Sequence, residues 1–276
     1  MRLLEEELGV VLFTRGHRGM QLTEAGEALR LQISGPLRQI GHALYQVRSL
    51  PTETTGTVIF GIPPTLASFM GEQLLESARS KAPGITLQLV EGQSGHLLEW
   101  MRRGDLDAAV LYGPTPNGLN ATRLLDDDLM LVARPGSAAT TQGPIDTKAL
   151  AELPLILPGD AHSIRLAVEA AAGRARVRLK VAAVLDSFAL TKRLAATGEA
   201  YAILPEVAVR DELRNGTLVV VPFAFVLRRQ LFVAMQSSAE APRAILQIEQ
   251  IVRDEVAALV NAGSWSSARL FGIGDS

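Results

Sequence analysis

The chain opens with LLEEELGVVLF at residues 3–13, followed by RGHRG at residues 15–19 and LTEAG at residues 22–26. The first run predicts a helix that ends at Gly9, because glycine is the common residue just after a helix. The short apolar runs on either side of RGHRG predict two strands joined by a basic turn. Thr23 and the glutamates behind it form the pattern of a capped helix start. The opening therefore predicts a helix, a basic wing and a second helix.

The second helix is predicted to run to about residue 50. Its apolar residues recur in steps of three and four, which makes a narrow stripe. They are Leu22, Ala25, Leu29, Ile33, Leu37, Ile40, Leu44 and Val47. A helix this long with so narrow a stripe has little to pack on within its own domain, so we interpret it as a dimerising linker helix. Packing on its own domain is the alternative.

Beyond a polar hinge, strands and helices alternate, which predicts an α/β fold with a parallel sheet and helical crossovers. A break rich in proline and glycine begins at Arg134 and divides this part into two units. The first unit is expected to hold residues 57–134 and 231–262, and the second unit residues 135–230. Residues 263–276 are rich in serine and glycine and are expected to be a loose tail.

The composition sets limits on the function. The 276 residues include 27 basic and 29 acidic side chains, so the whole chain lacks the positive charge typical of nucleic-acid-binding proteins. It has no cysteine, which excludes disulfides, thiolate metal sites and cysteine nucleophiles. No apolar run approaches the roughly 20 residues that span a bilayer, and no signal peptide is present. We therefore expect a cytoplasmic protein that does not associate with a membrane.

Three motifs, in this order, resemble the LysR-type family of transcriptional regulators. The first is the opening itself, the second is GDLDAAV at residues 104–110, and the third is Asp186-Ser187 followed by GEAYAILP at residues 198–205. The resemblance covers nearly the whole chain. More weakly, EGQSGHLLEW at residues 91–100 resembles regulators of the nitrogen-assimilation-control subgroup.

The resemblance implies two Rossmann-like lobes with the architecture of type II periplasmic binding proteins. Ahead of them it implies a winged-helix remnant at residues 1–23 and a linker or dimerisation helix with its hinge at residues 24–56. The family assembles as dimers and tetramers, so a homodimer or homotetramer is implied. The first helices of the winged fold have no counterpart in this sequence. A late start assignment and a genuine truncation would both explain this.

The wing residues Arg15, His17 and Arg18 are expected to contact DNA phosphates. Such contacts give affinity without reading the base sequence. The amino-terminal part of a recognition helix contacts the base edges. Binding to a specific promoter is therefore expected only if the missing helices are present.

Five residues are expected to bind a small effector, most plausibly an organic anion. Thr65 and Ser94 each follow a strand and are expected to cap the next helix, where free N–H groups and the helix dipole favour a carboxylate. In the family these two junctions commonly hold the effector. In the second unit Arg165 is expected to clamp the anion, His162 to donate a hydrogen bond and Ser187 to start a helix. Each of these residues has an alternative interpretation without a ligand. The serines and the threonine would only cap their helices, the arginine would be solvated, and the histidine would be exposed.

Effector binding between the units is expected to change their relative angle. The hinges are expected near Arg134-Pro135 and Arg229-Gln230. Such a change would move the DNA-binding ends of an oligomer. A ligand has this effect only if it binds one arrangement more tightly than the other.

Two other functions are open. A truncated small-molecule receptor would dimerise without binding DNA specifically. An enzyme is disfavoured, because GQSGH at residues 92–96 has histidine where the nucleophile-elbow motif requires glycine. The histidines are scattered, and Asp126–Asp128 is best explained as a solvated turn rather than a metal cage. No catalytic residue, metal site or cofactor is therefore expected.

Overall fold

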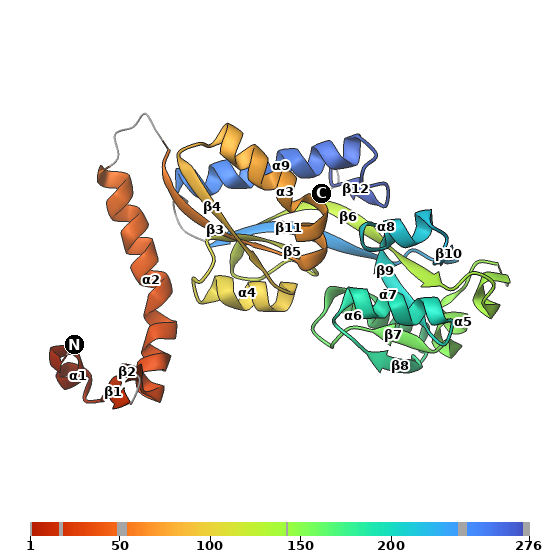
Figure 1. Ribbon diagram of the computed structural model, residues 1–276, viewed down its shortest axis with the longest axis horizontal. Coiled ribbons are helices and arrows are strands. Elements are labelled where there is room, and N and C mark those ends of the chain that lie inside the picture. The colour runs from red at the N-terminus through yellow and green to blue at the C-terminus, as the bar shows by residue number, and fades with distance from the viewer. Residues whose placement is uncertain (1, 17–18, 49–53, 142, 237–241, 273–276) are drawn as a thin grey trace.

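The computed structural model describes residues 2–16, 19–48, 54–141, 143–236 and 242–272. These residues form an amino-terminal arm and two lobes (Figure 1). The arm contains α1 (Arg2–Leu8), β1 (Phe13–Gly16), β2 (Gly19–Leu22) and the long helix α2 (Glu24–Arg48). No helix within the described ranges is long and apolar enough to cross a membrane.

The arm has the expected order of helix, hairpin and helix. Strands β1 and β2 are antiparallel, with Phe13 opposite Leu22. Thr23 caps α2, because its Oγ1 accepts a hydrogen bond from the Gly26 N–H at 3.0 Å. The same hydroxyl donates to the Val11 carbonyl at 2.7 Å. This threonine therefore ties the start of α2 to the segment ahead of the wing.

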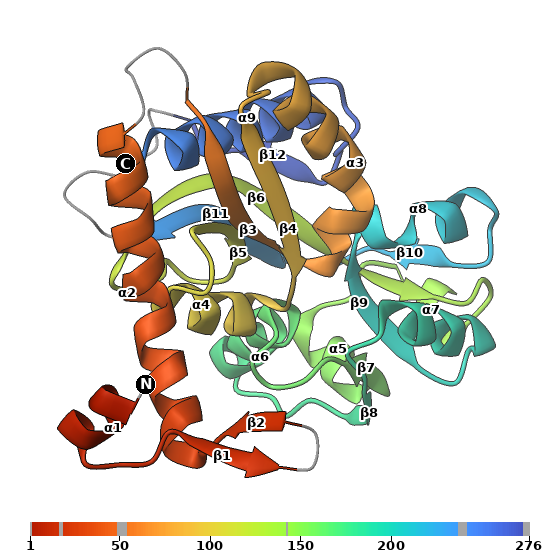
Figure 2. The same ribbon diagram turned by 60° about the vertical axis from the view of Figure 1, so that its left-hand side comes forward.

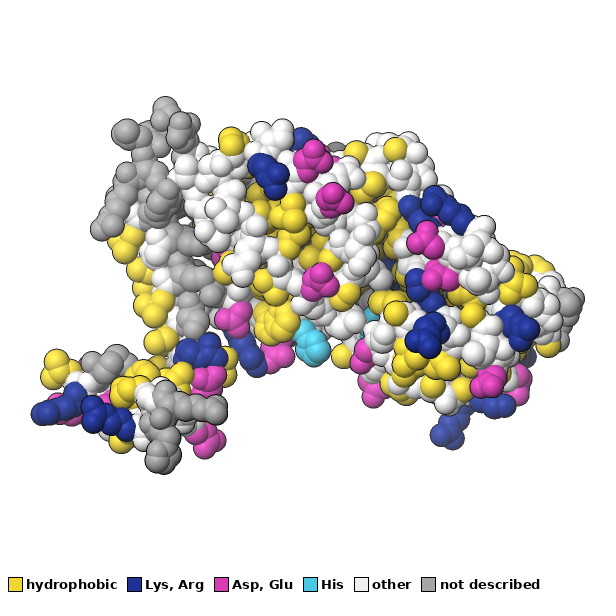
Figure 3. Space-filling model, in the orientation of Figure 1, with side chains coloured by type: hydrophobic (Ala, Val, Ile, Leu, Met, Phe, Trp, Pro, Cys, Tyr) yellow, Lys and Arg dark blue, Asp and Glu magenta, His cyan; other side chains and the backbone are white. Residues whose placement is uncertain are grey.

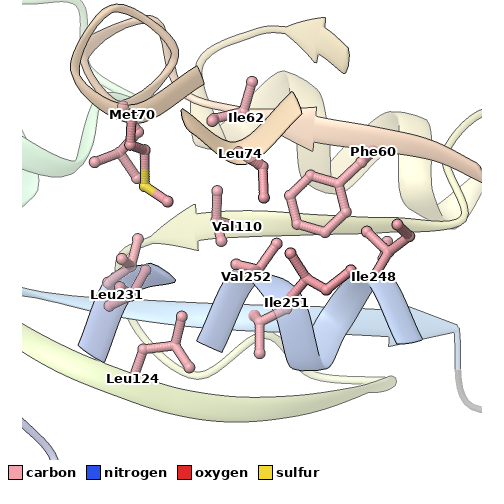
Figure 4. Close-up of a cluster of buried hydrophobic side chains, with 14 of the residues drawn as sticks. Phe60, Ile62, Met70, Leu74, Val110, Leu124, Leu231, Ile248, Ile251 and Val252 are labelled. Carbon is pink, nitrogen blue, oxygen red and sulfur yellow. The ribbon is translucent and has the colours of Figure 1, made fainter. Parts of the chain in front are cut away.

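Lobe I is a sheet between two layers of helices. It contains β3 (Gly56–Ile62), α3 (Pro64–Lys81), β4 (Ile85–Glu91), α4 (Ser94–Arg102), β5 (Ala108–Tyr112) and α9 (Arg243–Asn261). Strand β3 is parallel to β4 and to β5, as the alternation of strands and helices predicts. Helices α3 and α9 cover one face, where Phe60, Leu74, Val110 and Val252 pack together (Figure 4). Helix α4 covers the other face.

Lobe II repeats this plan on a smaller scale. It contains η1 (Ala138–Thr141), α5 (Thr147–Glu152), β7 (Leu155–Leu157), α6 (Ser163–Ala175), β8 (Val181–Val184), α7 (Phe188–Thr197), β9 (Tyr201–Pro205), α8 (Glu206–Arg214) and β10 (Val219–Val221). Strand β7 lies parallel to β8 and β9. Buried leucine, isoleucine and valine side chains from the strands and α6 form its core. The expected α/β fold of two lobes is confirmed.

Two long strands join the lobes. Strand β6 (Leu119–Ala133) leaves lobe I, and β11 (Arg228–Gln236) returns to it between β5 and β6. Leu125 belongs to the core of lobe I and Leu129 to the core of lobe II. The chain therefore changes lobe between these leucines, ahead of the break expected at residue 134.

The residues expected as hinges differ in their positions. Arg229 lies at the crossing, since it is opposite Asp127 in the register of β11 and β6. Arg134 lies within lobe II, where its Nη1 donates to the Thr197 carbonyl at 3.1 Å. The run Asp126–Asp128 was expected as a solvated turn, and this is wrong. It is part of β6, and Asp127 is fully buried.

The expectation of a loose tail is wrong for residues 263–272, the part that the structure describes; residues 273–276 of that tail lie outside the described residues. Residues Ala268–Leu270 form β12, which pairs antiparallel with β6. Trp265 is fully buried in the core of lobe I. The burial of one large aromatic side chain outweighs the serine- and glycine-rich composition of this segment.

Helix α2 runs beside lobe I and touches it at a pair of glycines (Figure 2). A Cβ atom on Gly104 would lie 2.5 Å from the Cα of Gly35. A Cβ atom on Gly35 would in turn overlap the carbonyl oxygen of Arg103. Gly104 also has a φ of 72°, which disfavours any other residue. Both the positive φ and the close approach to Gly35 therefore require the glycine of the GDLDAAV motif.

Substitutions of two glycines in α2 test this contact. At an exposed position inside a helix, alanine is more favourable than glycine by about 1 kcal/mol. Gly41→Ala should therefore raise the free energy of unfolding, because nothing lies within 4 Å of its added Cβ. Gly35→Ala should lower it by about 1 kcal/mol or more, because the overlap with lobe I exceeds the helical gain. Urea unfolding followed by circular dichroism measures both, and equal stabilisation by the two variants would show that Gly35 is not packed on lobe I.

Candidate effector-binding cleft

Lobe I presents two helix starts at the carboxyl ends of adjacent parallel strands. We expected Thr65 and Ser94 to cap these helices, and both caps are wrong. Helix α3 begins at Pro64 because proline suits a first helical position, which places Thr65 inside the helix. Ser94 is the first residue of α4 rather than its cap. Neither N-cap residue makes a side-chain hydrogen bond. In α3 Pro64 has no N–H and the Leu66 N–H donates to the Pro63 carbonyl at 2.9 Å, which leaves the N–H of Thr65.

Ser94 has a different structural partner. Its Oγ accepts a hydrogen bond from the backbone N–H of Tyr112 at 2.9 Å, which ties α4 to the end of β5. A serine hydroxyl keeps its own proton for donation when it accepts such a bond. Ser94 can therefore hold β5 and still donate to a ligand. Thr65 is half-buried near the start of the neighbouring helix α3.

Lobe II presents the start of α6, and His162 caps it. Its Nδ1 accepts a hydrogen bond from the Ile164 N–H at 3.1 Å. The imidazole packs edge-on against Phe188, with ring centroids 5.9 Å apart. Burial lowers the pKa of His162 to about 4, and the positive charge of Arg229 adds to this effect. The ring is therefore neutral at neutral pH, and because Nδ1 accepts, Nε2 carries the proton and can donate.

The side chains of Arg165 and Ser187 already have partners within the protein. The Arg165 guanidinium pairs with Glu169 at 2.7 Å and with Asp160 at 3.3 Å, so two carboxylates already compensate its charge. Ser187 caps α7 as expected, with its Oγ accepting from the Leu190 N–H at 3.3 Å. A ligand that used Arg165 would have to compete with these carboxylates.

The two lobes meet where these helices begin. A Cβ atom on Gly95, in the first turn of α4, would lie 3.7 Å from the Cβ of Ala161, directly before His162. A small pocket at the same end of lobe II is lined by His162, Asp186 and Phe188. The structure thus brings Ser94, His162 and the start of α7 together. Arg165 reaches this pocket, because its Nη1 donates at 3.3 Å to the carbonyl oxygen of Pro158, which also lines it. Thr65 is not among the lining residues.

A buried polar cluster that the sequence did not predict lies beside this cleft. Asp127 has no exposed surface, and its Oδ2 accepts from Arg229 Nε at 3.1 Å and Nη2 at 2.9 Å. Its Oδ1 accepts from Trp265 Nε1 at 3.1 Å and Ser267 Oγ at 3.0 Å. The Arg229 guanidinium stacks 3.4 Å above the ring of Tyr112. An acidic run inside an apolar strand pattern, with Arg228-Arg229 later in the chain, was the available signal.

The wing side chains are only partly described. Arg15 lies on β1 and is exposed. His17 and Arg18 lie outside the described residues. Its exposed position leaves the Arg15 guanidinium accessible to a phosphate.

The buried histidine gives a pH prediction. The pKa of His162 is lower in the folded protein than its usual 6.5, so folding favours the neutral ring. The free energy of unfolding therefore keeps its full value above pH 6.5 and decreases as the pH falls towards 4. The decrease between pH 7.5 and pH 5 should be about 2 kcal/mol. His162→Asn keeps a capping acceptor without a titrating group and should lack this loss.

Urea unfolding at both pH values measures the difference between wild type and His162→Asn. His96→Asn is the matched control, because His96 is exposed. It should keep the wild-type pH dependence. An identical pH dependence in wild type and His162→Asn would contradict the buried, neutral imidazole.

Comparisons with known proteins agree with this architecture. A model described as "LysR substrate binding domain" matches residues 51–257, and one described as "Bacterial regulatory helix-turn-helix protein, lysR family" matches residues 1–27. The HTH-type transcriptional regulator BbuR of Bordetella bronchiseptica is 29% identical over 265 residues, which cover 95% of this chain and 81% of the relative. The nitrogen assimilation regulatory protein nac of Escherichia coli is 34% identical over 210 residues, 75% of this chain and 68% of that protein.

The fold has a similar solved counterpart. A full-length OxyR variant from Pseudomonas aeruginosa has a TM-score of 0.71 and 25% identity, with 92% of this chain and 86% of that chain covered. The relatives are transcriptional regulators rather than enzymes. The two lobes form the effector-binding regulatory domain of such a regulator. The chain belongs to the LysR family of bacterial transcriptional regulators.

Proposed function

We propose that a small organic anion binds in the cleft between the lobes and controls the binding of promoter DNA by the arm. The observation that carries this proposal is the meeting of two helix starts, one from each lobe, at Gly95 and Ala161. A ligand held there contacts both lobes at once. Its binding therefore depends on their relative angle, as a population shift requires.

The chemistry of the cleft favours a carboxylate. The starts of α3 and α4 have no side-chain cap, and N–H groups at a helix start attract anions. The Ser94 hydroxyl and the Nε2–H of His162 add donors from opposite lobes. Arg165 and Ser187 complete our proposed set, although both have structural partners.

The arm supports dimerisation through α2. Ile33, Leu37, Ile40 and Leu44 follow one stripe of this helix and are 36% to 58% exposed. Figure 3 shows hydrophobic side chains along the edge of the arm that faces away from lobe I. We propose that this stripe pairs with a second copy, in a homodimer or homotetramer. Arg15, with His17 and Arg18, would then contact promoter phosphates in the cytoplasm.

One observation favours a second candidate, a small-molecule receptor that dimerises without specific DNA binding. Helix α1 has no buried residue, and it is tied to the wing through Glu5, whose Oε1 accepts hydrogen bonds from the Leu12 and Phe13 N–H groups, rather than through apolar packing. A recognition helix needs a fixed orientation to read base edges. Gel retardation with promoter DNA and with a scrambled duplex of equal length distinguishes the two candidates. Only the regulator should bind the promoter DNA more tightly than the scrambled duplex.

The cleft itself is tested with two variants. A thermal-shift screen of small carboxylates first identifies a ligand, and calorimetry then measures its affinity. Thr65→Val and Ser94→Ala should each weaken binding about fivefold, the effect of one lost hydrogen bond of about 1 kcal/mol. Ser94→Ala should also lower stability, because the buried Tyr112 N–H loses its acceptor.

Ser68→Ala is the matched control, because Ser68 is exposed on α3 beyond its first turn. It should bind the ligand with wild-type affinity. Wild-type affinity in Thr65→Val and Ser94→Ala would remove both residues from the site. A screen in which phosphates or neutral sugars stabilise the protein and carboxylates do not would contradict the proposed effector class.

A further inference from the structure

We propose that residues Ser264–Leu270 form a carboxyl-terminal strap that holds the two lobes at one relative angle. The strap binds lobe I, lobe II and the strand that joins them. It therefore sets how readily the cleft changes its opening. Only the consequence for effector binding rests on the function proposed above.

The attachment to lobe I is largely apolar. Trp265 is fully buried and packs edge-on against Phe69 of α3, with ring centroids 5.3 Å apart. The strap then continues into β12, where Ala268 is opposite Asp127 and Leu270 is opposite Leu125 of β6. Burial of a side chain as large as tryptophan makes this end difficult to detach.

Polar contacts from α8 attach the strap to lobe II, and Val207 of the same helix packs directly on the core of lobe I. Glu206 Oε2 accepts from the Ser267 N–H at 2.9 Å and also from the Ser266 hydroxyl. Arg210 donates to the carbonyl oxygen of Ser264. The Arg210 guanidinium also lies 4.8 Å above the ring of Phe69 in lobe I. Two side chains of one lobe II helix thus hold the strap on both sides of Trp265.

The strap reaches the crossing point of the chain. Trp265 and Ser267 both donate to Asp127, inside the segment where β6 passes from one lobe to the other. Rotation of the lobes about this segment moves α8 away from Trp265 and Phe69. The polar bonds of Glu206 and Arg210 must break in that movement, whereas the buried tryptophan can stay in place. The polar end of the strap can therefore be released while the end that holds Trp265 stays attached to lobe I.

Distances between the lobes test the strap without any effector. The chain has no cysteine, so Glu72→Cys on α3 and Arg193→Cys on α7 place spin labels only at two exposed positions. Labelled chain is diluted with unlabelled chain to suppress distances between subunits. Electron–electron double resonance then gives the distribution of distances between lobes I and II. Glu206→Ala/Arg210→Ala should broaden this distribution at least twofold relative to the parent.

Asp211→Ala/Arg214→Ala is the matched control. It removes one acidic and one basic side chain from the same helix, and both are exposed. Its distribution should equal that of the parent. Tryptophan fluorescence in a Trp100→Phe background reports that Trp265 remains buried in every variant.

A distribution unchanged by Glu206→Ala/Arg210→Ala would overturn the strap, and so would equal broadening in the control. If the double variant unfolds, Ser266→Ala takes its place, because its exposed hydroxyl donates to Glu206. Broadening in this variant supports the strap, and an unchanged distribution overturns it. Because no effector is added, failure of the proposed effector site would leave this result intact.

Discussion

A buried carboxylate imposes the constraint on which the arrangement of the two lobes depends. Asp127 lies where β6 passes between the lobes, and water cannot stabilise its charge there. Arg229, from the strand that returns to lobe I, pairs with it, and the strap supplies two further donors. Loss of one partner from such a buried pair costs about 3–5 kcal/mol, because the other charge is left uncompensated. The two crossing strands and the strap are therefore held in one register.

The same cluster connects the cleft to the crossing strands. Ser94 binds the backbone of Tyr112, and the ring of Tyr112 stacks under Arg229. On the other side of the cleft, the charge of Arg229 reaches His162. A ligand between Ser94 and His162 thus lies next to groups that define the relative position of the lobes. This adjacency gives effector binding a physical route to the angle between the lobes, and through lobe I to α2, which touches it at Gly35.

Local patterns predicted the order of elements, since the alternation of strands and helices and the capping by Thr23 depend on residues only a few positions apart. The α/β lobes and the family followed from these patterns. The helix caps were less predictable, because Pro64 and His162 compete with the neighbouring serine or threonine in ways that depend on exact backbone geometry. Asp127 and Trp265 were missed for another reason. Their partners lie far away along the chain, and residue type alone predicts an exposed aspartate and a loose serine-rich tail.

A crystal structure with the best carboxylate from the ligand screen tests the central claim most directly. We expect the ligand between the starts of α3 and α4 in lobe I and the start of α6 in lobe II, within hydrogen-bonding distance of Ser94 and of His162 Nε2. The Asp127–Arg229 pair should remain formed in that complex. A ligand bound elsewhere, such as in the pocket that Gly35 and Pro36 of α2 form with Arg102 and Arg103 of lobe I, would contradict the account.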